Sequence, residues 1–171
     1  FGGMPASEQL AFYVNTKPIT GNKFGTQTPI YWQDTFLATK AGGSARGTYA
    51  VQIVNPILFF QALVPDMYKR PNAPIFDFAD MDNPAGEHLF NDFVTCLTGA
   101  FKRFSLLSGQ NQMDTIDFIQ ANLDKFAVTM DEEVENSYQW STNYGLKVTS
   151  VNIQADYDAA TLEILEEARK D

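Results

Sequence analysis

Three stretches near the start of the chain are predicted to be β-strands, because two of them, residues 8–15 and 44–54, alternate with a period of two and the third has a strand-like composition. The three stretches are residues 8–15, 28–33 and 44–54. In the first of them, Leu10, Phe12 and Val14 share one face. Pro18 disfavours helix in the residue before it, so Lys17–Thr20 is expected to continue this stretch as extended chain.

Glycines punctuate these stretches. Gly21 and Asn22 carry the two-residue turn signal of a hairpin, so we expect the early strands to pair in antiparallel fashion. Gly47 lies inside the third stretch. A glycine inside a strand predicts either a β-bulge or the close approach of another backbone.

Two Asn-Pro pairs predict helix starts, because Asn is a good N-cap and Pro suits the first helical position. The pair at Asn55-Pro56 begins a short helix that ends near Val64. The pair at Asn83-Pro84 begins a long helix, whose apolar residues keep helical spacing until Gly109 stops the run.

The last third of the chain predicts one more long helix, a strand and a final helix. Asp114 caps the long helix and Gly145 stops it. The strand spans Leu146–Gln154, and its alternation changes phase near Thr149–Ser150, which predicts a bulge. Asp158 caps the final helix. The order of these elements predicts an α+β fold, an antiparallel, twisted sheet with helices packed on one face.

Composition narrows the possible functions. The chain has 171 residues, a net charge of −9 and 14 Phe, which suits one acidic domain with an aromatic core. This charge argues against a nucleic-acid surface and against direct docking on anionic lipid. The single cysteine rules out an internal disulfide and fits a reducing compartment. The chain opens at Phe1, so we expect it to be a piece of a longer protein.

Catalytic and metal-binding clusters are not apparent. His88 and Cys96 are eight helical residues apart, a rise of about 12 Å, which is too far for a Cys–His dyad. We expect Cys96 to be a small core residue and His88 to be exposed. One Cys and one His do not make a zinc site.

Residues 65–83 show no period, and we expect a long acidic loop with a short extended piece at Ile75–Phe76. Three acidic residues of this loop, together with a fourth just after it, could in principle hold calcium. Their spacing does not match a calcium-binding loop, so we favour a solvated acidic loop. These acids are Asp77, Asp80, Asp82 and Glu87.

Three further patterns have a simpler structural interpretation. Gly21–Thr26 is too short for a phosphate-binding loop, and Gly42–Gly47 lacks the nucleophile-elbow spacing. The acids of residues 131–135 suit a charged outer helix face. The Phe residues of the first long helix could contact lipid or a partner, but core packing is favoured. We therefore expect no catalytic, cofactor-binding or metal-binding residue.

Two segments carry a resemblance. Residues 12–30 and residues 46–56, together with a last strand beginning at Tyr144, resemble the bacterial SPFH (Band 7) family. More narrowly, they resemble its virion core protein-like subgroup, which is similar to stomatin, prohibitin and flotillin domains. The motif positions, for which the resemblance implies structural roles, are Asn15, Thr16, Gly21, Phe24, Gly25, Thr26, Gly47, Thr48, Tyr49, Asn55, Pro56 and Gly145.

The resemblance implies one domain at residues 1–157, lacking a membrane-proximal β-rich portion upstream, and the start of a helical arm at residues 158–171. It also implies a non-enzymatic scaffold on the cytoplasmic side of a bacterial membrane, with membrane contact through regions outside this chain. Such a scaffold self-assembles and recruits partner proteins, in some cases in envelope stress, and needs no cofactor. The alternative is a small-molecule-binding, metal-binding or hydrolytic domain with a site near the Asp77–Glu87 loop.

Overall fold

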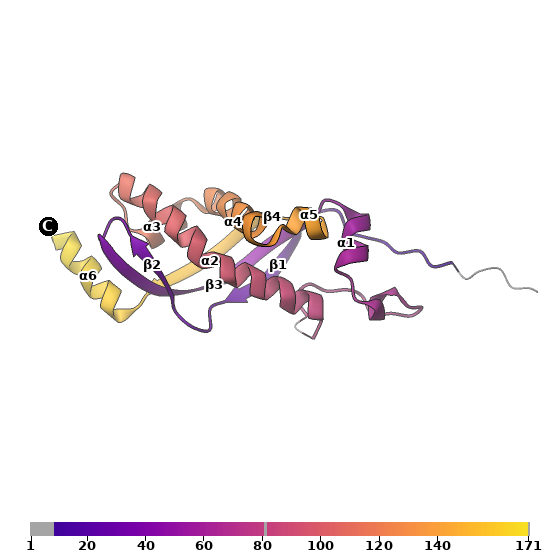
Figure 1. Ribbon diagram of the computed structural model, residues 1–171. Helices are drawn as coiled ribbons and strands as arrows, with labels where there is room; N and C mark the ends of the chain where they lie inside the picture. The colour runs from indigo at the N-terminus through magenta and orange to yellow at the C-terminus, as the bar shows by residue number, and fades with distance from the viewer. Residues whose placement is uncertain (1–8, 81, 171) are drawn as a thin grey trace, which may run out of the picture.

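The computed structural model describes residues 9–80 and 82–170. It shows an α+β fold in which helices cover one face of a four-stranded antiparallel sheet (Figure 1). The elements are β1 (Ile19–Gly25), β2 (Ile30–Asp34), β3 (Thr39–Ile53), α1 (Pro56–Ala62), the 3-10 turn η1 (Asp66–Lys69), α2 (Pro84–Gln110), α3 (Thr115–Ala121), α4 (Leu123–Tyr138), α5 (Trp140–Tyr144), β4 (Leu146–Tyr157) and α6 (Ala159–Lys170).

The 15-residue strand β3 lies at the centre of the sheet. Strand β4 pairs along one edge of it, from Gly43 opposite Tyr157 to Ile53 opposite Leu146. Strands β2 and β1 pair with successive parts of the other edge. One long strand therefore joins both ends of the molecule. Helix α6 lies at one end, and α1 lies at the other (Figure 1).

Burial alternates along β2 and much of β4 and separates two faces of the sheet, whereas in β3 the runs Ala41–Gly43 and Tyr49–Val51 are buried throughout. Residues such as Phe24, Trp32 and Ile153 are buried beneath the helices. The core is rich in aromatic contacts, and the Tyr49 and Phe93 rings stack with their centroids 4.0 Å apart. The predicted core role of the Phe residues in α2 is confirmed, since Phe101 is also fully buried.

The helix starts form as the sequence predicts. The Asn55 side chain accepts a hydrogen bond from the Leu58 amide, and the Asn83 side chain accepts one from the Ala85 amide. Each of these caps is followed by Pro at the start of its helix. Asp158 caps α6 in the same way, through the Thr161 amide.

The second long helix is wrong as a single element, because it breaks into α3, α4 and α5. Asn122 has non-helical dihedrals, and its side chain donates to the Phe118 carbonyl while its own carbonyl accepts from the Phe126 amide. Gln139 is left-handed, with φ 50°. Gly145, with φ 67°, ends the segment as predicted.

The N-terminal expectations need most correction. Residues 9–15 form no strand, and residue 8 lies outside the described residues. Gly21 and Asn22 lie inside β1 and not in a hairpin turn. Gly21 has φ 79°, and the register slips between Ile19 and Asn22. The buried Asn22 amide then donates to the carbonyls of Ile19 and Tyr49, which turns an apparent hairpin signal into a bulged strand.

Two predictions about the strands are confirmed. The bulge at Thr149 is confirmed, because Ala50 pairs with Ser150 while Val51 pairs with Val148. A close approach at Gly47 is also confirmed, since a Cβ there would collide with the Asn152 carbonyl. Ile75 and Phe76 have no regular secondary structure, which agrees with a short extended piece inside a loop. Strand β4 continues to Tyr157, past the predicted end at Gln154.

Candidate functional site

An apolar groove of about 670 Å³ lies at the α1 end of the molecule. Three segments line it: the extended arm of residues 10–15, helix α1 with Val64, and the loop of residues 70–78. The end of β3 contributes Ile53 to the groove, so the groove continues from the core of the sheet. We call this feature the α1 groove.

Aromatic rings make up much of the groove wall. Phe59 lies with its ring centroid 5.6 Å from those of both Phe76 and Phe78. Phe76 also meets Tyr68 at 5.2 Å. Phe12 of the arm packs against Phe60 at 4.7 Å. Edge and tilted contacts of this kind hold the wall together without closing the groove.

Local sequence explains why the loop stays open. Pro65, Pro71 and Pro74 exclude regular helix or a paired strand from most of it. Asn72 adopts φ 60°, and the Ala73 amide bonds back to the Arg70 carbonyl, so the chain reverses there. The segment then runs extended past Ile75 and presents its aromatic residues to α1.

The arm of residues 10–15 is held mainly by side-chain packing. Directly after the arm, the side-chain amide of Gln52 in β3 donates to the Thr16 carbonyl at 3.0 Å. The Asn15 side chain accepts a hydrogen bond from the Lys17 amide, two residues further along the chain. Leu10 and Phe12 line the groove yet remain partly exposed.

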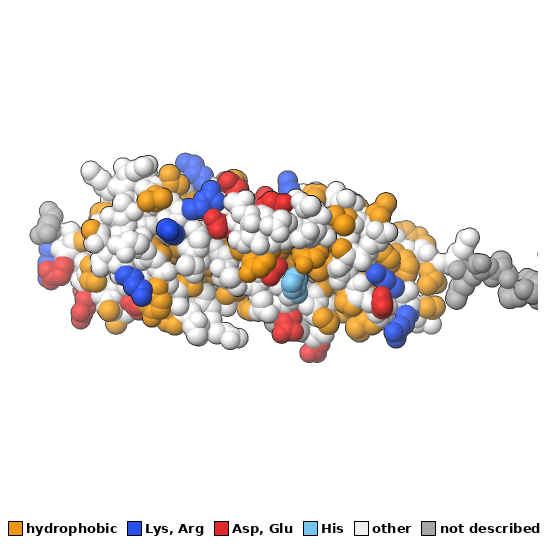
Figure 2. Space-filling model, in the orientation of Figure 1, with side chains coloured by type: hydrophobic (Ala, Val, Ile, Leu, Met, Phe, Trp, Pro, Cys, Tyr) orange, Lys and Arg blue, Asp and Glu red, His pale blue; other side chains and the backbone are white. Residues whose placement is uncertain are grey.

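The rim of the groove is unusually apolar for a surface. Tyr13 is 97% exposed and Ile75 is 92% exposed, and both line the groove. Figure 2 shows hydrophobic side chains gathered over the α1 end of the molecule, with Lys and Arg side chains beside them. The Lys69 ammonium lies 4.9 Å from the centre of the Phe60 ring. Exposed apolar surface of this kind suits the docking of another apolar surface.

His88 and Cys96, the two residues considered for a dyad, lie on the same helix but do not meet. The His88 Nε2 atom lies 3.0 Å from the Tyr144 hydroxyl and 3.4 Å from the Asp92 carboxylate. Cys96 is buried, as predicted, and burial together with Glu133 and Asp92 raises its thiol pKa to about 12. Asp92 itself accepts a hydrogen bond from the Trp140 indole, so it fastens α5 to α2.

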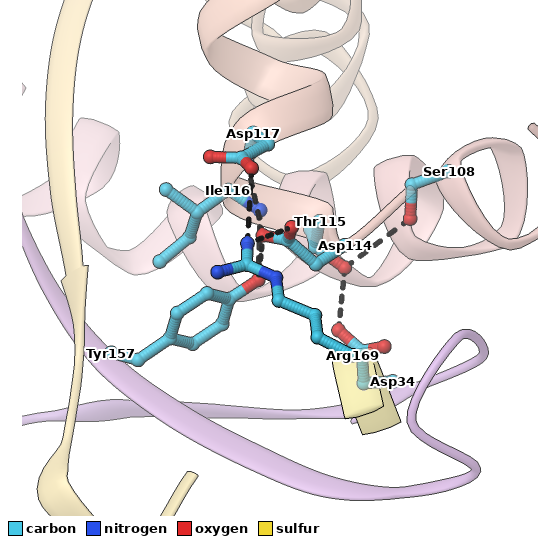
Figure 3. A network of polar contacts seen from close by, with 8 residues as sticks. All are labelled: Asp34, Ser108, Asp114, Thr115, Ile116, Asp117, Tyr157 and Arg169. Carbon is cyan, nitrogen blue, oxygen red and sulfur yellow. Dashed lines mark hydrogen bonds and ion pairs between the residues drawn. The ribbon is translucent and has the colours of Figure 1, made fainter. Parts of the chain in front are cut away.

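A second polar cluster lies at the other end of the sheet, where α3 begins (Figure 3). The Tyr157 hydroxyl donates to Asp114 at 2.7 Å and accepts from the Ile116 amide at 3.0 Å. Arg169 of α6 donates to both Asp114 and Asp117. These contacts join β4, α3 and α6, and each charged group has a partner within the cluster.

Electrostatics in this cluster follow from its contacts. Burial acts to raise the pKa of Asp114, but hydrogen bonds from Tyr157, the Asp117 amide and Arg169 outweigh burial and place that pKa below its ordinary value. Burial and the Asp114 charge raise the pKa of Asp117. Burial raises the pKa of Tyr157, which stays a neutral donor. The arrangement suits structural bonding more than proton transfer.

The motif residues are spread along the chain and do not converge on one site. Asn15 ends the arm and Thr16 follows it, while Gly145 stops α5 against the Asn55 backbone. Others fix the sheet: the Thr26 hydroxyl accepts from the Ala45 amide at 3.1 Å. The remaining motif positions occupy β1, β3 and the start of α1: Gly21, Phe24, Gly25, Gly47, Thr48, Tyr49, Asn55 and Pro56.

Sequence reasoning missed the groove. The alternation of Leu10, Phe12 and Val14 was a correct sign of an extended segment, but it marks a groove wall and not a paired strand. The run of aromatic residues Phe59, Phe60, Phe76 and Phe78 around prolines was a usable second signal.

Comparison with known proteins does not assign the chain to a family. No family model and no curated protein matches this chain. No group of three or more His, Cys, Asp or Glu side chains within residues 9–80 and 82–170 is placed to hold a metal ion. In the same residues, no helix is both long enough and apolar enough to cross a membrane.

Proposed function

We propose that this chain is a non-enzymatic scaffold domain on the cytoplasmic side of a bacterial membrane, where it self-assembles and recruits partner proteins. The α1 groove is the observation that carries the proposal. It combines an open apolar volume with the strongly exposed side chains of Tyr13 and Ile75, which together resemble the apolar centre of a protein-protein contact. In this proposal the membrane contact comes from regions outside this chain.

Several titratable side chains are buried and serve structural contacts, which supports the non-enzymatic part of the proposal. The Cys96 thiol is buried with a raised pKa, whereas a reactive thiol needs a lowered one. Asp34, Asp92 and Asp114 are buried and bond to structural donors. The family resemblance of residues 12–30 and 46–56 is the support for the membrane location and for a role in envelope stress.

Cell fractionation tests the proposal. In cells that express the protein at its natural level, we expect the protein to sediment with membranes as an assembly many times its monomer mass. Tyr13→Asp with Ile75→Asp should abolish the chemical cross-linking of partner proteins to this chain, because a charge at each position opposes apolar docking. Leu106→Asp with Val128→Asp is the matched control, since both residues are exposed elsewhere on the surface. A soluble monomer in the cell would contradict the proposal.

A second candidate function is the binding of a small apolar molecule, which the volume and lining of the groove favour. Asp77 lines the groove, so this candidate keeps a site near the acidic loop. A thermal-shift screen with apolar metabolites and divalent metals tests it. A ligand of the groove should raise Tm, and Val14→Trp should abolish that rise by filling the groove, whereas Leu106→Trp should leave it intact. No shift with any compound counts against this candidate.

A further inference from the structure

The sheet face turned away from α2, α3 and α4 differs in charge from the rest of the chain. Register assigns to it the even-numbered residues of β3 and the residues that pair with them. The Asp158 carboxylate lies against Gly42 at one end of this face. Among the described residues that the register places on it, four are basic and one is acidic, a net charge of +3 (4 − 1) in a chain of −9. These residues are Lys23, Lys40, Arg46, Lys147 and Asp156. We call this surface the open sheet face.

Its centre is a shallow hollow of about 400 Å³. Lys23 and Arg46 line the hollow together with the side chains of Thr48, Asn152 and Gln154. Arg46 makes an exposed ion pair with Asp156 at 3.4 Å, while Lys23 makes none with any residue that the structure describes. The hollow has apolar lining as well as ammonium, guanidinium and amide donors, and these donors suit an acidic protein segment.

The chain itself carries such a segment. Asp77, Asp80, Asp82 and Glu87 are exposed, and none of them makes an ion pair within the described residues. The Asp77 carboxylate accepts a hydrogen bond from the Ala79 amide, and the Asp80 carboxylate accepts one from the Asp82 amide, at 2.9 Å each. Each of these bonds uses one carboxylate oxygen and leaves the other available. No Lys or Arg occurs in residues 77–87, so these four acids carry a charge of −4. We call them the acidic loop; three of them precede α2, and Glu87 lies in the first turn of that helix.

We propose that the open sheet face of one copy binds the acidic loop of a second copy. This inference rests on the proposed self-assembly and deepens it by naming the two contacting surfaces. Because the surfaces differ, the contact is head-to-tail and leaves one free surface of each kind on every dimer, so assembly continues into rings or filaments. Charge complementarity sets the register of such a contact and excludes like-charged pairings.

Two complementary variants test the proposal. Lys23→Glu with Arg46→Glu destroys the open sheet face but keeps the acidic loop, and Asp82→Lys with Glu87→Lys does the reverse. Each variant alone should remain monomeric at about 1 mM, the concentration that detects weak contacts. An equimolar mixture should form a dimer. In NMR spectra of the ¹⁵N-labelled loop variant, the unlabelled sheet variant should shift amides around Thr48 and Asn152.

Matched variants separate a specific contact from net charge. Lys102→Glu with Lys125→Glu, and Glu163→Lys with Glu166→Lys, change the same charges at exposed sites away from both surfaces. Both should associate as the unmodified chain does. Dimers should persist at about 0.15 M salt, where the Debye length is about 8 Å, and dissociate near 1 M, where it is about 3 Å.

Three results would overturn the inference: a chain that stays monomeric at about 1 mM, a mixture that forms no dimer, or control variants that abolish association equally. The amide spectra also report whether each variant is folded. If the proposed scaffold still sediments from cells as a large assembly while the mixture forms no dimer, the assembly uses other surfaces and only this inference fails.

Discussion

The Thr115 hydroxyl donates a 2.6 Å hydrogen bond to the Asp34 carboxylate, across 81 residues of sequence. Asp34 ends β2 and is fully buried. It also accepts hydrogen bonds from the Trp32 indole and the Leu37 amide, each at 3.0 Å. One carboxylate therefore fixes the β2–β3 turn and docks the start of α3 against it.

Removal of this carboxylate should be costly. Asp34→Ala leaves buried donors of Trp32 and Leu37 without an acceptor, so we expect the free energy of unfolding to fall by on the order of 3–5 kcal/mol. Thr115→Val should cost only about 1–2 kcal/mol, since the carboxylate keeps two donors. Urea unfolding measures both. Asp156→Ala, which loses an exposed ion pair with Arg46, is the control and should cost at most about 1 kcal/mol.

The Tyr157–Asp114 bond predicts a pH dependence of stability. The folded pKa of Asp114 lies below its unfolded value of about 3.9. The unfolded state therefore binds the extra proton between these two values, and the stability from Asp114 is full above the unfolded pKa and is lost as pH falls through the folded pKa. Tyr157→Phe removes one of the hydrogen bonds that lower this pKa.

We expect the difference in unfolding free energy between the unmodified chain and Tyr157→Phe to be constant near neutral pH and to narrow below about pH 4. A residual difference should remain, because the Ile116 amide also loses its acceptor in the variant. Burial raises the pKa of Asp131, so its contribution to stability changes with pH in the opposite sense. This contribution is the same in both proteins and cancels in the difference. Tyr31→Phe, on the exposed face of β2, should show no pH-dependent difference. If the difference in unfolding free energy between the unmodified chain and Tyr157→Phe did not change with pH, Tyr157 would not be lowering the pKa of Asp114.

Much of the fold can be predicted from the sequence because its signals are local. Asn55 and Asn83 cap helices through contacts two or three residues away, and such contacts leave a clear trace in the sequence. The α+β class follows from the order of the elements, and the bulge at Thr149 follows from a change of phase. The family resemblance remains a prediction.

The failures share one physical cause, which is the dominance of distant partners over local preference. Gly21-Asn22 has the residues of a hairpin turn, but the Asn22 side chain bonds to Tyr49, 27 residues away, and the pair becomes part of β1. Residues 9–15 alternate like a strand but find no strand to pair with among the described residues. The groove likewise depends on how α1, the arm and the loop meet, which no local pattern encodes.

Two glycines in neighbouring strands should respond differently to the same substitution. A Cβ at Gly47 would collide with the Asn152 carbonyl of the paired strand, whereas a Cβ at Gly25 would meet its nearest atoms at 4.0 Å. We expect Gly47→Ala to lower the free energy of unfolding by at least about 2 kcal/mol, as overpacking against a backbone does. Gly25→Ala should lie within about 1 kcal/mol of the unmodified chain. Equal effects in urea unfolding would disprove the close approach.

The single thiol gives a final prediction about local opening. Cys96 is buried on α2, and its pKa of about 12 leaves about one thiolate in 10⁴ molecules at pH 8. Native protein should therefore react with a thiol reagent only as fast as the helix layer opens, while protein in denaturant should react at once. Thr95→Cys, at the neighbouring exposed position, is the control and should react immediately in the folded state. If native Cys96 reacted as fast as this control, the thiol would be accessible, and the interpretation of α2 as a closed structural layer would be wrong.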